Sequence, residues 1–551
     1  MTNLPKKNDL WFLPLGGAGE IGMNLNLFGH DGQWLMVDLG ITFSDRLGIE
    51  IITPDPSFIL PFQKQLVGLV LTHAHEDHVG AVPYLWPLLR CPIYATPFTA
   101  AIVRQKISEY PWRNQVELIE VPLSGKIGVG KFDIEFITLT HSIPEPNALA
   151  ISTSLGTVLH TGDWKIDPTP LVGKKTNESR LKELGNQGIL AMVCDSTNVF
   201  TEGESGSEQA VREELTDLIG EFPDSRITIA CFASNVARLE TAALAAKQHG
   251  RKVALLGRSL HRMVRAAEYA GYLKNVPEFI SDDEAMDLPP EKVLFITTGS
   301  QGEPRSALAR IAANQHPVVK LGSKDVVFFS SRVIPGNEKS IGLLQNRLVQ
   351  NGVEVITAHE ADIHVSGHPA REELKQMYRW VRPRIAIPVH GEARHLQEHA
   401  YLAEDEGVNE VIIPQNGSLI RIESGKSKEL ELVQAGRWML DGNRMVDSTC
   451  IMLKDRNKLS IQGLIVASLM IDSMGQLLRI PQFTIMGVAQ DGDEKDVLTR
   501  ELHKTIRETL LDDYKNDDAR QNAVKLVIRQ TTNKLFGKKP IVEVHFILGM
   551  A

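Results

Sequence analysis

The chain has 551 residues, which is too long for a single hydrophobic core, so two to four domains are expected. Its 43% hydrophobic and 23% charged residues are ordinary for a globular protein, and no apolar run approaches the ~20 residues that span a bilayer. The formal net charge of -9 argues against a broad basic surface for nucleic acid, but a local basic channel on an acidic surface would still accept one.

The first 200 residues alternate strand-like runs with short helical patterns, which is typical of an α/β domain. Strands are expected at 11–15, 23–28, 34–38, 66–72, 132–138 and 157–161, and a helix at 81–89. Residues 17–22 fit the dinucleotide pattern G-x-G-x-x-G, but a run with a period of two follows them. Because a dinucleotide site needs a helix at that point, a strand–turn–strand hairpin is the better interpretation.

The segment Thr72–His78 concentrates three imidazoles and a carboxylate directly after the apolar run 66–71. His73 and His75 are two residues apart, so extended backbone points both to the same side. Asp77 and His78 follow where the chain must turn. Four tetrahedral ligands could not all reach one ion from so short a segment without strain, so two metal ions are the easier geometry. A solvated polar turn is the alternative interpretation.

Residues 208–361 have a different pattern, in which strands and helices alternate at a regular pitch. Strands are expected at 226–231, 252–256, 293–297 and 326–330, and helices at 208–219, 236–249, 259–273 and 305–313. This alternation predicts a doubly wound parallel sheet, and small polar loops at the carboxyl ends of its strands are where a ligand would bind.

Four scattered positions repeat the pattern of a polar residue at the end of a predicted strand: His141, Asp163, Asp195 and His390. Each alone is consistent with an ordinary hydrogen-bonded residue, but such loops gather at one edge of a layered α/β fold. Imidazole and carboxylate ligands suit zinc, with manganese or iron as alternatives. The four cysteines are far apart and form no C-x-x-C pair, and no secretory leader is recognisable, so we expect a reducing, cytoplasmic location.

The C-terminal part predicts a small α+β domain. Apolar periodicity lapses around 441–449, which indicates a linker. Strands are then expected at 464–471, 477–480 and 541–548, with two helical stretches between the second and third strands.

These motifs resemble a known family. The H-x-H-x-D-H cluster, His141 and Asp163 resemble, in order, the motifs of the metallo-β-lactamase fold, and Asp195, His364 and His390 resemble the additional motifs of its β-CASP nucleic-acid-processing branch. Longer strings resemble bacterial ribonuclease J: 232–235 (FASN), 298–304 (TGSQGEP), 334–337 (IPGN), 364–368 (HVSGH) and 388–392 (PVHGE). The resemblance is dense over about residues 10–445 and weaker beyond them.

The resemblance implies a metallo-β-lactamase αββα sandwich with an inserted β-CASP doubly wound parallel-sheet domain and a small α+β C-terminal domain. The lactamase domain would comprise residues 1–207 and 362–440, and the β-CASP domain residues 208–361. A linker at 441–450 would precede the C-terminal domain at 451–551.

The resemblance also assigns roles to residues. His73, His75 and His141 would hold one zinc ion, Asp77, His78 and His390 the other, and Asp163 would bridge the two; manganese is the alternative metal. Asp38 would support the ligands, and Asp195 and His368 would form a proton-transfer pair. An RNA phosphate pocket would be lined by Ala233, Ser234, Asn235, His364, Val365, Ser366, Gly367 and His368. A structural calcium ion would lie near Leu47, Ile49 and Asp441.

Two departures from the family pattern stand out. Glu145 stands where family members often carry Asp, and the string 483–487 (FTIMG) differs from that of the best-known members. Neither departure touches the predicted metal ligands, but the second leaves the mode of assembly open.

The implied function is a zinc-dependent ribonuclease that acts on single-stranded RNA in RNA maturation and decay. It would be a 5′-to-3′ exonuclease preferring 5′-monophosphate ends, with endonuclease activity as well. A homodimer or homotetramer is expected, within an RNA-decay complex and without a membrane partner. The alternatives are a β-CASP nuclease acting on DNA or on precursor 3′ ends, a small-molecule hydrolase, and a non-catalytic RNA-binding paralogue.

Overall fold

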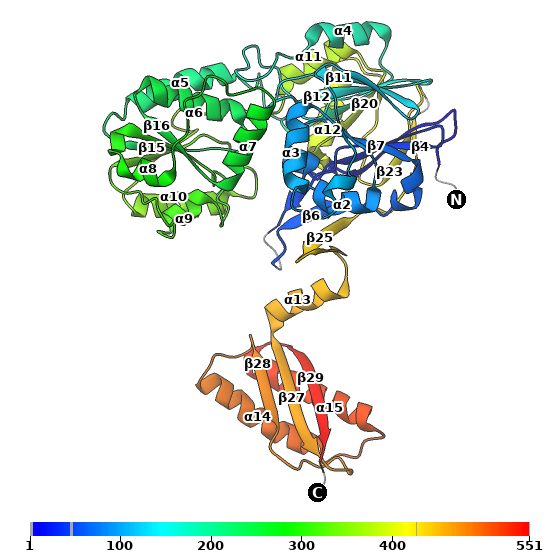
Figure 1. Cartoon of the computed structure of the whole chain (residues 1–551). Helices are drawn as coiled ribbons and strands as arrows, with labels where there is room; N and C mark the ends of the chain where they lie inside the picture. The colour runs from blue at the N-terminus through cyan, green and yellow to red at the C-terminus, as the bar shows by residue number, and fades with distance from the viewer. Residues whose placement is uncertain (1–3, 45–47, 426, 550–551) are drawn as a thin grey trace. The chain divides into compact units, whose positions relative to one another are not determined.

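The computed structural model describes residues 4–44, 48–425 and 427–549. In its first part, two β-sheets pack face to face (Figure 1). The first sheet has eight strands, in the order β24 (Lys428–Leu432), β23 (Ser418–Arg421), β1 (Leu10–Gly16), β3 (Leu25–His30), β4 (Gln33–Val37), β7 (Leu66–Val70), β8 (Ile93–Ala95) and β9 (Leu118–Glu120). Its pairings are antiparallel from β24 to β4 and parallel from β4 to β9.

The second sheet has seven strands and carries the ends of several strands predicted to bear ligands. Its order is β10 (Lys126–Val129), β11 (Phe132–Thr138), β12 (Asn147–Thr153), β13 (Gly156–His160), β14 (Ala191–Asp195), β20 (Ile385–Val389) and β22 (Glu410–Val411). The strands from β13 to β22 are parallel, so β13, β14 and β20 end at the same edge. Residues more than 200 positions apart in the sequence therefore meet there.

Helices cover the outer faces of both sheets and complete an αββα sandwich. They are α1 (Glu76–Val79), α2 (Val82–Leu89), α3 (Pro97–Ile107), α4 (Glu178–Gln187), α11 (Arg371–Val381) and α12 (Ala393–Asp405). The core between the sheets includes Phe12, Phe28, Phe136 and Val193, and a second core lies between the second sheet and α4, α11 and α12. Because β14 and β20 are buried on both faces, their sequences are continuous apolar runs rather than alternating ones.

A five-stranded parallel sheet forms the inserted domain. Its order is β16 (Lys252–Leu256), β17 (Val293–Thr297), β15 (Arg226–Ala230), β18 (Asp325–Phe329) and β19 (Glu354–Thr357). One face is covered by α5 (Glu208–Gly220), α6 (Val236–Gln248) and α7 (Arg258–Tyr269), and the other by α8 (Asp282–Asp287), α9 (Ala307–Ala312) and α10 (Glu338–Gln350). The adjacent strands β17, β15 and β18 end in the loops at 298–304, 232–235 and 330–337, so these loops are neighbours.

The described residues within 44–50 and 438–549 form a second compact unit. Its sheet has the order β28 (Gln482–Met486), β27 (Leu464–Ile471) and β29 (Ile541–Leu548), and it packs on α14 (Asp493–Thr509) and α15 (Asp517–Phe536). Burial alternates along β27, so one face of the sheet contacts these helices. The unit also contains α13 (Ile451–Gln462).

The short remaining elements are strands and 3-10 turns. They are β2 (Ala18–Gly19), β5 (Thr42–Phe43), β6 (Ile51–Pro54), β21 (Gly391–Glu392), β25 (Arg437–Asp441), β26 (Arg444–Asp447), η2 (Leu60–Gln65), η3 (Arg113–Gln115) and η4 (Pro290–Lys292). The segment 17–22 contains β2, which pairs with β21, and leads into β3 rather than into a helix.

Most predicted elements differ from the observed ones by a few residues at their ends, and two expectations need comment. The strand expected at 477–480 is wrong: only Leu477 forms an isolated bridge, and the strand lies at Gln482–Met486, after Pro481. Proline at 481 fixes its φ and lacks an N–H, so pairing begins beyond it. The predicted linker at 441–450 includes β26, which pairs with β25. Among the described residues, no helix combines the length and the apolar character needed to cross a membrane.

We expect Leu502→Ala to destabilise the second unit locally. Leu502 is fully buried on α14 between Leu498 and Ile506, so its truncation leaves a cavity that costs about 2–5 kcal/mol. Leu526→Ala on α15 is the matched control, because Leu526 is 55% exposed. Hydrogen exchange of the full chain, followed by mass spectrometry, should show faster exchange of β27 in the first variant only. Equal protection of β27 in both variants would contradict this packing.

Candidate functional site

The seven predicted metal ligands come together at one edge of the αββα sandwich. His73 and His75 follow β7, and Asp77 and His78 lie on the one-turn helix α1. His141 lies between β11 and β12, Asp163 lies three residues beyond the end of β13, and His390 directly follows β20. Their ligand atoms form two groups, each with all atoms within 4.8 Å of one another: His73, His75, His141 and Asp163; and Asp77, His78, Asp163 and His390.

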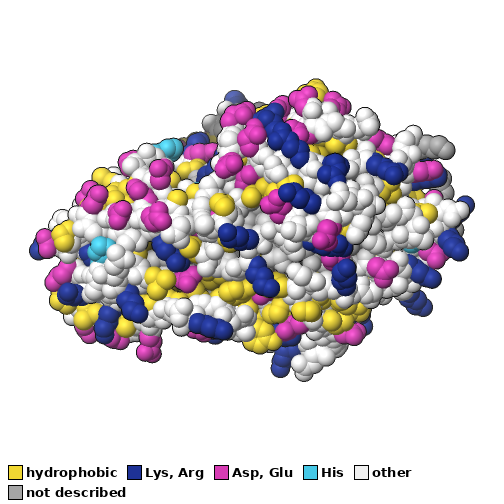
Figure 2. Space-filling view, turned by 90° about the horizontal axis from the view of Figure 1, so that it is seen from above, with side chains coloured by type: hydrophobic (Ala, Val, Ile, Leu, Met, Phe, Trp, Pro, Cys, Tyr) yellow, Lys and Arg dark blue, Asp and Glu magenta, His cyan; other side chains and the backbone are white. Residues whose placement is uncertain are grey.

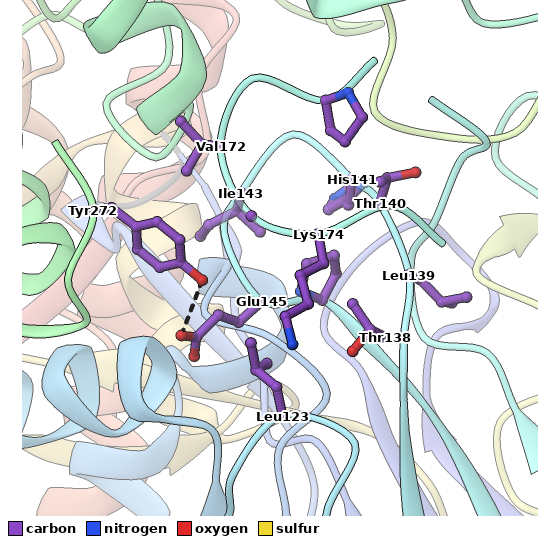
Figure 3. Close-up of a pocket in the computed structure, with 13 residues that line it drawn as sticks. Leu123, Thr138, Leu139, Thr140, His141, Ile143, Glu145, Val172, Lys174 and Tyr272 are labelled. Carbon is purple, nitrogen blue, oxygen red and sulfur yellow. Dashed lines mark hydrogen bonds between the residues drawn. The ribbon is translucent and has the colours of Figure 1, made fainter. Parts of the chain in front are cut away.

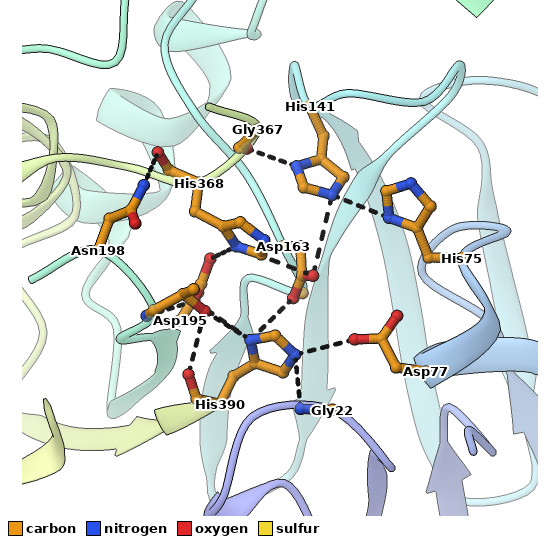
Figure 4. Close-up of polar contacts among 12 residues, drawn as sticks. Gly22, His75, Asp77, His141, Asp163, Asp195, Asn198, Gly367, His368 and His390 are labelled. Carbon is orange, nitrogen blue, oxygen red and sulfur yellow. Dashed lines mark hydrogen bonds and ion pairs between the residues drawn. The ribbon is translucent and has the colours of Figure 1, made fainter. Parts of the chain in front are cut away.

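Three imidazoles and one carboxylate make up the first group. Nδ1 of His75 lies 3.1 Å from Nε2 of His73 and 3.0 Å from Nε2 of His141. Oδ2 of Asp163 lies 3.8 Å from Nε2 of His141 (Figure 4) and 3.8 Å from Nε2 of His73. Most of these ring nitrogens therefore face one another rather than a carboxylate. Ligands around a metal ion are arranged in this way.

The second group contains two imidazoles and two carboxylates. Nε2 of His78 lies 3.2 Å from Oδ2 of Asp163 and 3.6 Å from Oδ2 of Asp77. Nε2 of His390 lies 3.2 Å from Oδ2 of Asp77, and its Nδ1 lies 3.8 Å from Oδ1 of Asp163. Asp163 belongs to both groups, so its carboxylate is placed to bridge two neighbouring ions.

Burial and neighbouring charges set the protonation states of the two groups so that they favour bound cations. Burial lowers the pKa of His73 and His141 well below the ordinary value and that of His75 to about 4, so these rings are neutral at pH 7. Burial would also lower the pKa of His78, but Asp163, Asp77 and Asp38 raise it well above the ordinary value. The carboxylates therefore attract positive charge, and a metal ion would supply it in place of a proton.

Asp38, which the resemblance assigns to supporting the ligands, contacts His78 and Thr72. Its Oδ2 lies 2.7 Å from Nδ1 of His78, and its two oxygens accept hydrogen bonds of 2.8 Å from the backbone N–H and the hydroxyl of Thr72. Asp38 is fully buried and has a φ of 62°, a left-handed conformation that non-glycine residues rarely adopt. A carboxylate on Nδ1 leaves Nε2 of His78 directed at the other ligands.

The predicted proton-transfer pair is in direct contact beside the second group. Nδ1 of His368 lies 2.8 Å from Oδ2 of Asp195. The other oxygen of Asp195 accepts hydrogen bonds from the backbone N–H and the hydroxyl of Thr197, at 2.9 and 2.7 Å. Burial would lower the pKa of His368, but the Asp195 carboxylate and its hydrogen bond raise it above the ordinary value. The Asp195 carboxylate therefore favours the protonated form of His368 next to the predicted metal site.

The residues expected to bind a phosphate lie in two segments that border one core. Ala233, Ser234 and Asn235 precede α6, and Asn235 caps that helix by accepting a hydrogen bond of 2.9 Å from the backbone N–H of Arg238. His364 to Gly367 lie between β19 and α11, and Val365 packs against the same apolar cluster as Ala233. Burial lowers the pKa of His364 to about 3, and its Nδ1 is buried without a hydrogen-bond partner.

The 364–368 segment also contacts the metal and proton-transfer residues. Nδ1 of His141 donates to the carbonyl of Gly367. Asn198 donates 2.7 Å to Oγ of Ser366 and 3.1 Å to the carbonyl of His368. A Cβ on Gly367 would lie 2.8 Å from the His141 ring, so glycine is required for this approach. The predicted phosphate segment is therefore in direct contact with a predicted metal ligand and with the residues beside Asp195.

Several contacting residues escaped the sequence-based predictions. Thr197 lies 2.8 Å from Nδ1 of His390, Asn24 donates 3.1 Å to the carbonyl of Asp77, and the backbone N–H of Gly22 lies 3.3 Å from Nε2 of His390. Thr197 and Asn198 directly follow Asp195, and that spacing was a usable signal, since a strand-end carboxylate commonly binds the residues just after it. Nothing local in the sequence links Asn24 or Gly22 to the site.

Glu145, one of the two departures from the family pattern, joins three segments. It is 5% exposed, its Oε2 accepts a hydrogen bond of 2.8 Å from the backbone N–H of Phe98, and its Oε1 accepts one of 3.2 Å from the hydroxyl of Tyr272. Figure 3 shows this pair beside the small pocket next to His141. Glu145 thus connects α3 and the chain following α7 to the loop that carries His141.

The calcium site expected near Leu47, Ile49 and Asp441 receives no support from the described contacts. Leu47 lies outside the described residues. Both carboxylate oxygens of Asp441 accept hydrogen bonds from the guanidinium of Arg456, at 2.9 and 3.1 Å. A calcium ion would have to displace that guanidinium.

The three domains and the site together define a metal-dependent nuclease of the metallo-β-lactamase fold with a β-CASP insertion. Residues 22–184 match the metallo-β-lactamase superfamily, and residues 224–348 match the ribonuclease J β-CASP domain. Residues 352–414 match the Zn-dependent metallo-hydrolase RNA specificity domain, and residues 451–547 match the ribonuclease J C-terminal domain. In that fold, the His/Asp groups are compatible with a metal-binding site.

Relatives that match nearly the whole of this chain identify its family. Ribonuclease J of Sinorhizobium meliloti is 42% identical over 98% of this chain and 98% of that relative. Ribonuclease J of Corynebacterium glutamicum is 39% identical over 93% of this chain and 72% of the relative, and that of Helicobacter pylori is 32% identical over 98% and 80%. The chain belongs to the ribonuclease J family, and it is a metal-dependent ribonuclease.

A solved structure repeats the fold. A protein of unknown function from Enterococcus faecalis superposes with a TM-score of 0.52 and 16% identity, over 75% of this chain and 100% of that chain. At this identity the match shows the fold alone.

Gly40→Ala is expected to abolish metal binding. A Cβ at Gly40 would lie 1.7 Å from the carbonyl oxygen of Asp77, so the backbone that carries Asp77 and His78 would have to move. Gly342→Ala on α10 is the matched control, because its Cβ meets nothing within 4 Å. Metal content of the purified variants should fall only in the first. Full metal occupancy in Gly40→Ala would refute the close approach of the two segments.

Proposed function

We propose that this ribonuclease uses two zinc ions to degrade RNA from its 5′ end, prefers a 5′-monophosphate, and also cleaves internally. The observation that carries the proposal is that Asp163 is shared by two His/Asp groups, with the Asp195–His368 pair next to them. Manganese is the alternative metal. RNA maturation and decay in the cytoplasm is the corresponding role.

The donor set fits a pair of zinc ions. His73, His75 and His141 would hold one ion, Asp77, His78 and His390 the other, and Asp163 both. Imidazole and carboxylate ligands without thiolates suit zinc. Two metal ions held by these residues would lower the pKa of a bound water and offset charge on the phosphoryl oxygens.

The chain's own residues then handle the proton that the leaving 3′-oxygen needs. Asp195 accepts from Nδ1 of His368, which leaves Nε2 of that ring as the atom that can release a proton. Thr197 fixes Asp195 through two hydrogen bonds, so the pair is oriented before substrate arrives. Cleavage with the 3′-oxygen as leaving group gives a 5′-phosphate and a free 3′-hydroxyl.

A polar pocket for the 5′-monophosphate is supported by the two segments that border α6. Ser234 lies just before this 13-residue helix, whose N-terminal N–H groups favour an anion. Ser366 and His364 come from the other segment, and Ser366 is held by Asn198. The distance from this pocket to the predicted metals would match the length of one nucleotide, so one nucleotide would be released at each step. A 5′-triphosphate would be too bulky for the pocket.

Local contacts, rather than a broad basic field, are expected to hold the RNA. Acidic and basic side chains are interspersed on the face drawn in Figure 2. Basic side chains near the site are scattered rather than clustered. One of them, Arg332, donates 2.8 Å from its Nη1 to Oδ1 of Asn198. Protein contacts to the RNA backbone and its phosphates tolerate any base sequence.

Assembly into a homodimer or homotetramer, within an RNA-decay complex, remains part of the proposal. The face of the C-terminal sheet directed away from α14 and α15 carries the half-buried Val466 and Met470 and the 49% exposed Ile547. Such residues suit pairing between subunits.

The central test follows 3′-labelled RNA that carries either a 5′-monophosphate or a 5′-triphosphate. We expect mononucleotides from the first substrate and much slower degradation of the second. His75→Ala should lose both bound metal and products, whereas His261→Ala, an exposed position on α7, should retain both. A chelator should abolish activity, and added zinc or manganese should restore it. Equal rates on both RNAs would remove the pocket.

His368→Ala should slow hydrolysis by about 10²–10⁴-fold because it removes the proposed proton donor. Metal content should stay near that of the unmodified chain, since His368 belongs to neither proposed ligand set. Asp195→Asn should produce a defect of the same kind. Single-turnover rates with saturating RNA isolate the chemical step, and an unchanged rate in His368→Ala would exclude this donor.

A further inference from the structure

A buried chain of four charged side chains joins the metal-ligand loops to the predicted phosphate segments. Lys165, Asp167, Glu208 and Arg238 are 1%, 2%, 3% and 0% exposed, respectively. Two cations and two anions make the chain neutral overall. Charged groups buried this deeply are costly unless each is paired, so their geometry is tightly constrained.

One end of the chain is fixed to the loops of His141 and Asp163. The backbone N–H of Lys165 donates 2.7 Å to the carbonyl of Thr140, which directly precedes His141. The Thr140 hydroxyl donates 2.8 Å to the carbonyl of Lys165 and accepts 3.0 Å from the backbone N–H of Asp167. Lys165 is two residues beyond Asp163, so both ligand loops are anchored to the same point.

The middle of the chain crosses into the inserted domain where that domain begins. Nζ of Lys165 lies 3.2 Å from Oδ2 of Asp167 and donates 3.0 Å to the carbonyl of Gly206. Oδ2 of Asp167 also accepts 3.0 Å from the backbone N–H of Glu208, the first residue of α5.

The other end reaches both phosphate segments through one guanidinium. Nη2 of Arg238 donates 3.0 Å to Oε2 of Glu208, and Nη1 donates 2.8 Å to the carbonyl of Ile363, the residue before His364. Oε1 of Glu208 accepts 3.1 Å from Nδ2 of Asn235, the residue after Ser234. Glu208 and Arg238 thus hold the start of α6 and the 363–368 segment to a common point.

We infer that Glu208 and Arg238 are positioning residues that set the distance between the 5′-phosphate pocket and the metal centre. This inference rests on the proposed function. Apolar contacts alone would let α6 slide over its neighbours, whereas directional bonds between buried charges fix one register. The Glu208–Arg238 pair therefore determines how many nucleotides leave at each step and how strongly a 5′-monophosphate is preferred.

Glu208→Gln tests the inference, because glutamine keeps the size of the side chain but removes its charge. Arg238→Lys is the second variant: one ammonium cannot reproduce the guanidinium's separate bonds to Glu208 and Ile363. The matched control is Arg212→Gln. Arg212 also joins α5 to α6, through Glu240 at 3.3 Å and Thr241 at 3.1 Å, but neither of these partners contacts the metal loops.

Four readouts separate positioning from folding. Product lengths and the rate ratio for 5′-monophosphate over 5′-triphosphate RNA report the pocket-to-metal distance. Cleavage of circular single-stranded RNA, which has no 5′ end, and metal content report the metal centre alone. We expect Glu208→Gln to release dinucleotides and longer products beside mononucleotides and to lose about tenfold in the rate ratio. Arg238→Lys should shift in the same direction, and circular-RNA cleavage and metal content should be unchanged.

Arg212→Gln should match the unmodified chain in all four readouts. The inference is overturned if Glu208→Gln keeps both mononucleotide products and the rate ratio, or if it loses linear and circular cleavage in equal proportion. It is also overturned if Arg212→Gln changes product length as much as Glu208→Gln does. An unmodified chain with neither mononucleotide products nor a 5′ preference would instead refute the proposed function, and the inference with it.

Discussion

The carboxylate of Asp163 is the interaction on which the site depends. It lies within 3.9 Å of ring nitrogens from His73, His78, His141, His368 and His390, which come from four separate segments. Burial would raise the pKa of Asp163, but His390 and His78 hold it well below the ordinary value. A buried anion at the centre of so many imidazoles makes the site an attractor for positive charge, which a metal pair supplies.

The fold serves this anion by ending parallel strands at one edge. β13, β14 and β20 are neighbours in the second sheet, so Asp163, Asp195 and His390 meet although the inserted domain lies between the second and third of them in the sequence. The first sheet contributes β7 and the His73–His78 loop. Two layers packed on one apolar core therefore present ligands from opposite sheets to a common point. Asp38 and His390 keep left-handed backbone there, a strain that the surrounding packing maintains.

Local sequence patterns gave reliable predictions where a single element decides the outcome. The strands at 132–138, 252–256, 293–297, 464–471 and 541–548 have the predicted ends, because each is a run of apolar or alternating residues bounded by turn formers. The failure at 477–480 has the same origin: the apolar residues there suggested a strand, and Pro481 together with the neighbouring strand decided where pairing begins. The hairpin within 437–447 is short and half exposed, so its periodicity was too weak to predict.

By itself, the sequence determined which residue types are available and roughly where each strand ends, and its resemblance to a family assigned His73, His75, Asp77, His78, His141, Asp163 and His390 to one centre. Chain order and apolar periodicity carry that information. Only the tertiary structure decided the supporting contacts: Gly22 and Asn24 beside the ligands, Gly367 against His141, and the Lys165–Asp167–Glu208–Arg238 chain between domains. These contacts join segments that are far apart in the sequence, and their partners are set by sheet order and domain packing, which no local pattern encodes.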